Sequence, residues 1–303
     1  MGSSPSYDDT GLLNLEDYEA AARAVLPPAA LGYFEGGAMD GVTLRANPAA
    51  WERLRLRPRV LRDVSHVDMS VTVLGRTLEW PVLVAPMAFH AMAHPEGEAA
   101  TARAAHRVGS ILTLSTLATM SLEDVRAASA GPLWFQLYVY RDRGLTRSLV
   151  ERAEAAGYEA LVLTVDTPML GRREADVRHR FTLPQGLRAA NLTPSGEDRL
   201  PLPIEGSGLA AYILSLFDAS LTWRDVEWFR SITRLPVLLK GVLRADDARR
   251  AAESGAAGII VSNHGGRQLD TAIATADALP DVAEAADGLE VLVDGGIRRG
   301  TDV

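Results

Sequence analysis

The feature that most constrains the fold is a regular alternation of short apolar runs and amphipathic segments between residues 81 and 294. Short apolar runs typical of buried strands occur at residues 82–85, 111–114, 133–138, 160–165, 236–240, 258–261 and 291–294. Helical patterns follow several of them, at residues 95–108, 121–128, 145–156, 245–254 and 275–286. Parallel strands joined by helical crossovers produce this alternation, so the chain is expected to be an α/β protein. A (β/α)8 TIM barrel is the predicted architecture, and a doubly wound open sheet is the competing one.

The segment before the barrel is predicted to be an N-terminal extension over residues 1–66. It begins with a leader-like stretch, followed by a helix that Asn14 can cap and that Pro27 and Pro28 end. Residues 31–37, with aromatic side chains before two glycines, are interpreted as a short turn.

The barrel is predicted over residues 67–303, starting with a hairpin at residues 67–80. A long excursion rich in Pro, Gly and charge, residues 167–220, follows the fourth strand and is expected to act as a lid. Only seven strands can be counted, so the eighth strand is missing from this sequence. We expect a C-terminal segment to supply it, because an exposed edge of a buried parallel sheet would be a liability.

Composition excludes several classes of function. A net charge of −8 argues against non-specific binding of nucleic acid, which needs a basic face. The absence of cysteine excludes disulfides and thiolate metal sites, and fits a cytoplasmic protein. No apolar run reaches the roughly 18 residues of a membrane span, and no metal-ligand spacing is found.

Residues able to do chemistry follow the apolar runs. His264 and Arg267 come directly after the run at residues 258–261, separated by two glycines that let backbone approach a flat ligand. A histidine can carry a proton near neutral pH, and an arginine can bind a carboxylate through two parallel hydrogen bonds. Other candidates follow the remaining runs: Met87, Ala88, Ser115, Gln136, Tyr138, Thr164, Asp166, Lys240, Asp294 and Arg298. Because strand carboxyl ends converge at one mouth of a barrel, these side chains are expected to share a site.

The motifs also match a known family in order along the chain. The matching stretches are residues 85–88, 93–98, 136–140, 164–168, 170–176, 239–242, 262–267 and 294–299, which together span nearly the whole chain. With these motifs the chain resembles the FMN-dependent 2-hydroxy-acid oxidase/dehydrogenase family. The resemblance implies FMN as cofactor, and oxidation of an (S)-2-hydroxy acid to the 2-keto acid with reduction of O2 to H2O2.

The same resemblance implies four catalytic roles. His264 would take the proton from the substrate, and Asp166 would pair with its other ring nitrogen. Tyr138 would bond the hydroxyl side of the substrate. Lys240 would stabilise the negative charge that collects on the reduced flavin.

Binding roles are implied as well. The substrate carboxylate would be held by Arg173 and Arg267, with a hydrogen bond from Tyr33, and the register favours Arg173 over its neighbour Arg172. The residues implied to bind FMN are Ala85, Pro86, Met87, Ala88, Ser115, Gln136, Thr164, Lys240, Asp294, Gly296 and Arg298. The family's second phosphate-binding Gly–Arg pair, on the eighth strand, would fall beyond Val303.

Ordinary structural roles compete with some of these assignments. His66, His106 and His179 lack a motif and are predicted to be surface residues, and His94 is given a structural role. Asp166 taken alone could be a helix cap.

Substrate and electron acceptor are predicted from single positions. Leu117 stands where glycolate-preferring relatives carry a bulky aromatic residue, so the pocket is expected to accept aromatic acids, mandelate-like acids first. Ala88 and the polar excursion favour a soluble oxidase that uses O2, and the family suggests a homotetramer. The alternatives are a dehydrogenase with another acceptor, a different FMN barrel such as an isomerase, and a non-functional truncated barrel that binds no flavin.

Overall fold

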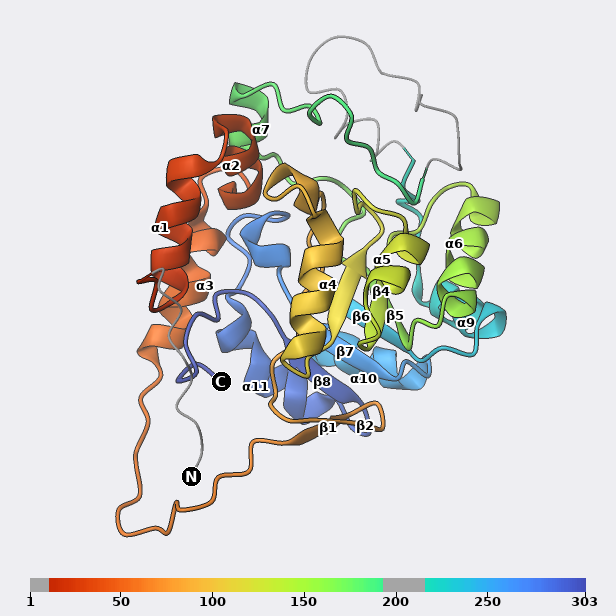
Figure 1. Cartoon of the computed structure of the whole chain (residues 1–303). Coiled ribbons are helices and arrows are strands. Elements are labelled where there is room, and N and C mark those ends of the chain that lie inside the picture. Colours follow the sequence, from red (N-terminus) through yellow and green to blue (C-terminus); the bar gives the residue numbers. More distant parts are fainter. Residues whose placement is uncertain (1–10, 193–215) are drawn as a thin grey trace.

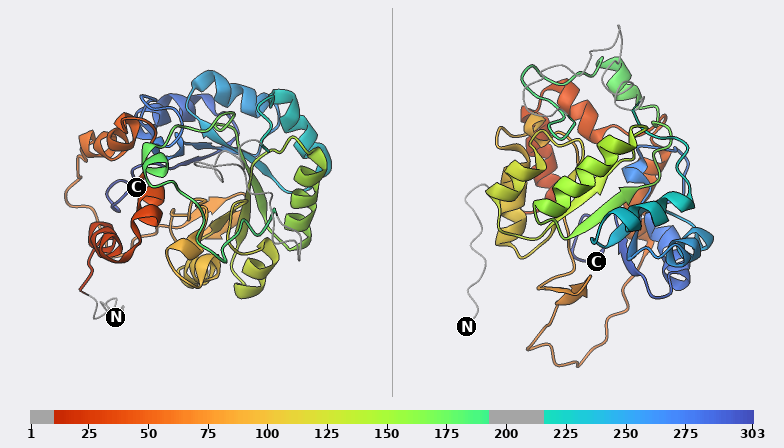
Figure 2. Two further views of the ribbon diagram at one scale, coloured as in Figure 1. Left: turned by 90° about the horizontal axis from the view of Figure 1, so that it is seen from above. Right: turned by 90° about the vertical axis from the view of Figure 1, so that its right-hand side faces the viewer.

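The computed structural model describes residues 11–192 and 216–303. Its centre is a six-stranded parallel sheet in the order β3-β4-β5-β6-β7-β8. The sheet curves into an arc with helices around its outer side, as the view from above shows (Figure 2). The strands are β3 (Leu112–Ser115), β4 (Leu133–Leu137), β5 (Ala160–Thr164), β6 (Val237–Val242), β7 (Gly258–Val261) and β8 (Glu290–Val293).

Helices of three kinds surround this sheet (Figure 1). The crossover helices are α4 (Gly97–Arg107), α5 (Leu122–Ala128), α6 (Arg143–Ala155), α9 (Trp223–Ile232), α10 (Ala245–Glu253) and α11 (Thr275–Ala285). The N-terminal helices are α1 (Leu15–Val25), α2 (Pro28–Glu35) and α3 (Val42–Arg53). Short pieces near the strand ends are α7 (Glu174–Arg178) and the 3-10 turns η1 (His90–Met92) and η2 (His264–Gly266).

Local sequence explains where several helices begin. Asn14 accepts hydrogen bonds from the backbone N–H groups of Glu16 and Asp17, so the predicted cap of α1 is confirmed. Ser121 caps α5 and Asp142 caps α6 in the same way. These side chains satisfy N–H groups that a helix start leaves without partners.

Two apolar layers follow from the alternation along each strand. Residues pointing outward, such as Phe135 and Leu161, join the large core between the sheet and the helices. Those pointing inward form a second cluster with the hairpin β1 (Val71–Val73) and β2 (Arg76–Leu78). The hairpin lies where the strands start, because the Leu74 N–H donates to the side chain of Glu290, the first residue of β8. The opposite, carboxyl end of the sheet is left for a binding site.

Two expectations about secondary structure were wrong, and two helices were missed. The run at residues 82–85 forms one isolated bridge, Val84 to Leu112, because Pro81 and Pro86 on either side have no N–H to donate. Residues 31–37 lie largely in α2, whose first residue, Pro28, has the preset backbone angle that suits a helix start. The helices α3 and α9 were not expected. In α9 a capping box formed by Thr222 and Asp225 gives a sequence signal that was available.

The excursion at residues 167–220 is only partly described. Its described residues include α7, and a bridge joins Tyr140 to Phe217. Residues 193–215 of the excursion lie outside the described residues, and the lid stays a prediction. Within residues 11–192 and 216–303, no helix combines the length and the apolar character needed to cross a bilayer.

Candidate active site

The inward-facing side chains of the strands change from apolar to polar toward the carboxyl ends of the strands. Successive inward positions change from Trp134 to Gln136 in β4, and from Leu238 to Lys240 in β6. Thr164 stands beside Lys240 in the strand register. All three polar side chains are buried, and the Gln136 amide donates to the Thr164 hydroxyl over 2.9 Å. The ends of neighbouring parallel strands therefore place hydrogen-bonding groups in one layer.

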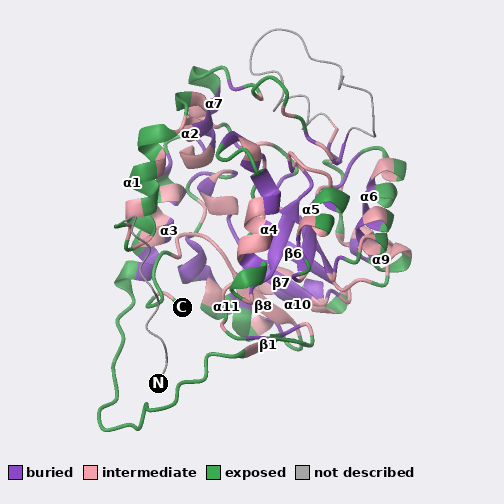
Figure 3. Cartoon of the chain, viewed as in Figure 1, coloured by how far each residue is buried: buried purple, intermediate pink, exposed green. Residues whose placement is uncertain are grey.

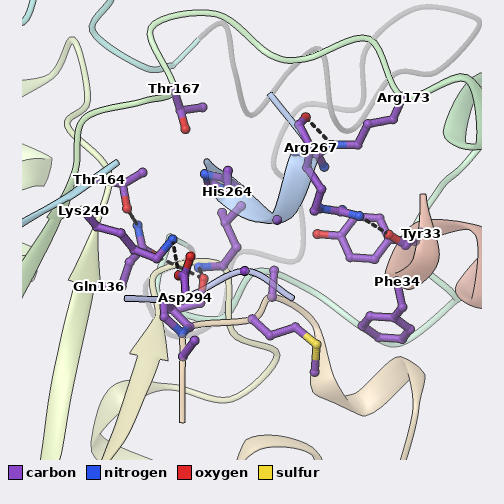
Figure 4. Close-up of a pocket in the computed structure, with 18 of the residues that line it drawn as sticks. Tyr33, Phe34, Gln136, Thr164, Thr167, Arg173, Lys240, His264, Arg267 and Asp294 are labelled. Carbon is purple, nitrogen blue, oxygen red and sulfur yellow. Dashed lines mark hydrogen bonds and ion pairs between the residues drawn. The ribbon is translucent and has the colours of Figure 1, made fainter. Parts of the chain in front are cut away.

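A pocket of about 490 Å³ opens above this layer (Figure 4). Figure 3 shows that the strands which carry these side chains are buried at the centre of the protein. Of the residues that the sequence singled out, those lining the pocket are Tyr33, Ala85, Pro86, Met87, Ala88, Ser115, Leu117, Gln136, Tyr138, Thr164, Arg173, Lys240, His264, Arg267, Asp294, Gly296 and Arg298. Asp166 lies behind His264 instead of on the wall.

His264 is held from both sides of its ring. Its Nδ1–H donates to Asp166 Oδ1 over 2.9 Å, which makes Nε2 the acceptor nitrogen of the ring. The hydroxyl of Tyr138 lies 3.5 Å from Nε2. The backbone N–H of His264 donates to Ser262 Oγ over 3.1 Å, which supports a left-handed backbone with φ of 58°. Such a conformation is uncommon for a residue with a side chain and marks a constrained position.

Burial sets the charge state of this pair. Burial lowers the pKa of His264, and the nearby Asp166 only partly offsets that effect. Burial alone would raise the pKa of Asp166, but the interactions with His264 and Lys240 outweigh it, so that pKa is lowered. Near neutral pH the imidazole is therefore neutral and the carboxylate ionised.

Gly241 makes room for the Asp166 side chain. It lies at an irregularity in the β6–β7 pairing and has φ of 115°. A Cβ atom at this position would lie 2.6 Å from the Cβ of Asp166. Only glycine fits there without displacing the carboxylate that orients His264.

The buried Lys240 forms an ion pair with the half-buried Asp294 at one side of the pocket. Lys240 Nζ lies 2.9 Å from Asp294 Oδ2 and donates to Ser262 Oγ over 2.8 Å. Burial alone would lower the pKa of Lys240, but Asp294 and Asp166 outweigh burial and raise it. The lysine therefore stays charged inside the protein.

Arg173 and Arg267 lie at the opposite side of His264 (Figure 4). Arg267 donates to the backbone carbonyls of Tyr33 and Gly36, each over 2.7 Å, and its guanidinium lies 5.1 Å from the centre of the Tyr33 ring. Arg173 donates to the Arg267 carbonyl over 3.4 Å. Burial and the charge of Arg173 lower the pKa of Arg267 to about 10, which keeps it a cation at neutral pH. Among the described residues, no carboxylate forms an ion pair with either guanidinium. Arg172, the neighbour not chosen by the register, is exposed.

Some residues of the site were missed in the sequence. Phe181 and Phe217 line the pocket, and Phe217 stacks on Tyr138 with ring centres 4.5 Å apart. Asn47 of α3 exchanges two hydrogen bonds with Asn263, which directly precedes His264. The pairing of an N-terminal helix with a loop more than 200 residues later leaves no local pattern.

The other histidines lie away from the pocket. His66, His106 and His179 are exposed, which confirms the surface prediction. His90, which the sequence had not singled out, is buried and its Nδ1 lies 3.0 Å from Thr101 Oγ1. In residues 11–192 and 216–303, no group of three or more His, Cys, Asp or Glu could hold a metal ion.

Comparison with known proteins identifies the family. Residues 22–303 match the family model described as FMN-dependent dehydrogenase. An L-lactate oxidase of Nostoc sp. is 53% identical over 296 residues, covering 96% of this chain and 81% of the relative. Glycolate oxidase 1 of Oryza sativa subsp. indica is 52% identical over 294 residues, covering 96% and 79%. A structure of mandelate oxidase with (S)-4-hydroxymandelic acid aligns with a TM-score of 0.90 at 46% identity, covering 96% of this chain and 81% of that one.

The chain belongs to the FMN-dependent dehydrogenase family. Within that family it is an enzyme of the 2-hydroxy-acid oxidase class, its cofactor is FMN, and its fold is the (β/α)8 barrel. The predicted fold class, family and cofactor are therefore confirmed.

The residues of the pocket fit FMN. Asp294 Oδ1 is buried and has no hydrogen-bond partner among the described residues, so it is available to a ligand hydroxyl. The backbone of Gly295 and Gly296 lines the pocket beside it. Lys240, next to Asp294, would lie by the flavin ring and Arg298 by the phosphate.

Proposed function

We propose that the enzyme oxidises an aromatic (S)-2-hydroxy acid, mandelate-like acids first, to the 2-keto acid and reduces O2 to H2O2. The reaction balances as hydroxy acid plus O2 giving keto acid plus H2O2. One observation carries the proposal: a neutral His264, held by the Asp166 carboxylate, faces the same pocket as two arginines that form no ion pair with a carboxylate of the described residues. A substrate carboxylate would complete the arginine pair and bring the hydroxyl carbon next to the histidine.

The chain's own residues supply the proton chemistry. In our proposal Nε2 of His264 takes the hydroxyl proton, since Nδ1–H is already committed to Asp166. Asp166 would stabilise the imidazolium that forms. Burial raises the pKa of the Tyr138 phenol, so this side chain keeps its proton and can donate to the substrate oxygen. FMN, when bound, supplies the two-electron acceptor for the oxidation.

An anaerobic spectrum tests the reaction. Mixing the FMN-loaded protein with (S)-mandelate should bleach the flavin absorbance. His264→Ala should slow this bleaching by about 10²- to 10⁴-fold, the usual contribution of a positioned base, while FMN stays bound. His66→Ala, an exposed histidine, is the matched control. Normal bleaching in the His264 variant would remove the proposed base.

The size of the substrate is proposed from Leu117 and its apolar surroundings. Leu117, Phe89, Phe181 and Phe217 line the pocket and leave an apolar wall for an aromatic ring. Likeness to mandelate oxidase supports this choice, whereas the lactate and glycolate oxidases among the relatives favour a small acid. The kcat/KM values for (S)-mandelate, L-lactate and glycolate decide between them. Leu117→Trp should lower kcat/KM for mandelate about 10-fold more than for glycolate. Far faster oxidation of glycolate than of mandelate by the unmodified enzyme would contradict the aromatic proposal.

The acceptor is proposed from Ala88, which lines the pocket close to the proposed flavin position. One H2O2 formed for each keto acid in air would support an oxidase. A dehydrogenase would form keto acid in air only when an added electron acceptor is present.

We also propose a cytoplasmic homotetramer. The arm at residues 54–69 projects from the body, as Figure 1 shows, and exposes several large apolar side chains, among them Leu56, Val60 and Leu61. Surfaces of this kind are often contact surfaces. Light scattering coupled to size-exclusion chromatography should give four times the 32.5 kDa chain mass, and the mass of a monomer would contradict the proposal.

A further inference from the structure

Gln268 is buried next to the site and uses its whole side-chain amide. Its Nε2 donates to the carbonyls of Asp166 and Met169 over 3.1 and 3.0 Å. Its Oε1 accepts from the Gly171 N–H over 3.2 Å and from Arg173 Nη2 over 3.5 Å. These four bonds use both donors and both acceptor positions that an amide offers. One side chain therefore contacts the segment that carries Asp166 and the arginine that faces the pocket.

The amide can point only one way. Turning it over would set its NH2 group against the Gly171 N–H and the Arg173 guanidinium, which are both donors. The backbone also approaches closely here: a Cβ on Gly171 would lie 2.2 Å from the Arg267 carbonyl oxygen and 2.4 Å from that of Gln268. The two loops are therefore in direct contact, and Gln268 fixes their relative position.

The chemical choice of an amide matters for charge. An amide oxygen accepts a hydrogen bond from Arg173 but carries no full negative charge, so the guanidinium keeps its attraction for an anion. Glutamate has nearly the same shape and would form an ion pair with Arg173. That carboxylate would compete with the carboxylate of a substrate.

We propose that Gln268 is a positioning residue that holds Arg173 without neutralising it and holds the backbone of Asp166 behind His264. This inference rests on the proposed function, because it assigns Arg173 to the substrate carboxylate. It predicts two separable effects. The charge at position 268 should control the affinity for a carboxylate ligand, and the N–H donors of the amide should control the rate of flavin reduction that depends on the Asp166–His264 pair.

The test measures binding and turnover separately. Phenylacetate carries the carboxylate but lacks the 2-hydroxyl, so its Kd can be measured by calorimetry on the FMN-loaded protein without turnover. Gln268→Glu should raise this Kd about 10- to 100-fold, the usual scale for a hydrogen bond to a charged group. Gln185→Glu is the matched control, because Gln185 is exposed. Its Kd should equal that of the unmodified protein.

A second variant tests the support that Gln268 gives to Asp166. It also keeps the inference testable if the Gln268→Glu protein does not fold. Gln268→Met is neutral and similar in length, so it should change the phenylacetate Kd less than Gln268→Glu does. It should slow flavin reduction by (S)-mandelate about 10-fold, because Asp166 loses its backbone support. The same melting temperature and FMN content as the control would show that these effects are not a general loss of structure.

Each outcome decides a separate point. A phenylacetate Kd within threefold of the unmodified value in a folded Gln268→Glu protein would overturn the inference. If that variant does not fold, unchanged Kd and unchanged reduction rate in Gln268→Met would overturn it. Failure of the unmodified enzyme to oxidise any 2-hydroxy acid would instead refute the proposed function, while phenylacetate binding would still test the role of Gln268.

Discussion

The two sides of the pocket contain cations in opposite electrostatic situations. On one side Lys240 is paired with Asp294 at 2.9 Å, and two carboxylates raise the pKa of the lysine. On the other side, among the described residues, the hydrogen bonds of Arg173 and Arg267 go to neutral oxygens. Burial and the charge of Arg173 lower the pKa of Arg267 to about 10, and the nearby Asp176 offsets only part of that effect. His264 lies between the two sides (Figure 4).

On the Lys240 side the protein itself supplies the carboxylate that balances the cation. On the arginine side a ligand would have to supply it. A buried cation with its own carboxylate contributes to the folded protein, since removing it leaves buried anions behind. A buried cation without one contributes little to folding but attracts an anion strongly. Stability and binding should therefore respond oppositely to mutations on the two sides.

The largest effect is expected on the paired side. Lys240→Met should lower the free energy of unfolding by about 3–5 kcal/mol, because the half-buried carboxylates of Asp294 and Asp166 would be left without this cation. Urea denaturation with excess FMN measures it. Adding Asp294→Asn to this variant should recover part of the loss, and a change below about 1 kcal/mol in the single variant would contradict the contrast.

On the side of Arg173 and Arg267 we expect a smaller effect, and we expect it on substrate binding instead of on stability. Arg173→Met should raise KM for (S)-mandelate about 10- to 100-fold, because a charged hydrogen-bond donor is lost. The free energy of unfolding should change little, because relief of the repulsion with Arg267 offsets the lost attraction between Arg173 and the buried Asp176. The exposed neighbour Arg172→Met is the control. A large loss of stability with unchanged KM would show that Arg173 supports the fold instead.

The smallest effect concerns pH at the histidine between the two sides. The base must be neutral, so kcat/KM should fall on the acid side as His264 becomes protonated. Burial lowers this pKa, so the decline should lie below pH 6.5, the ordinary value. Asp166→Asn removes the neighbour that raises the pKa, so the decline should move to still lower pH while activity also falls. A decline centred above pH 6.5 in the unmodified enzyme would contradict the assignment of the base.

Sequence patterns predicted the individual residues of the site better than the contacts between them. His264, Lys240 and Thr164 were found because each follows or ends an apolar run, and parallel strand ends converge. The pairing of Lys240 with Asp294 joins strands that are not neighbours in the sheet, so it depends on how the arc curves. Gln268 gave no signal, because an amide next to an arginine in a loop looks like an ordinary surface residue.

The fold was predictable where periodicity is strong and unpredictable where single residues decide. The six strands of the sheet follow from apolar runs, whereas residues 82–85 carry the same pattern but lie between prolines that limit pairing. The helix α3 was missed since it contains Pro48 and has few apolar residues in period. It is held in place by tertiary contacts, including the pair Asn47–Asn263.

Gly241 links the geometry of strand β6 to the position of Asp166. Any side chain at this position would collide with Asp166, so the strand and the Asp166–His264 pair cannot vary independently. Saturation mutagenesis of position 241, followed by selection for growth or activity, should recover glycine alone. The same selection should recover several residue types at many neighbouring positions. A designer who transplants the histidine–aspartate pair to another barrel would have to carry this strand irregularity along with it.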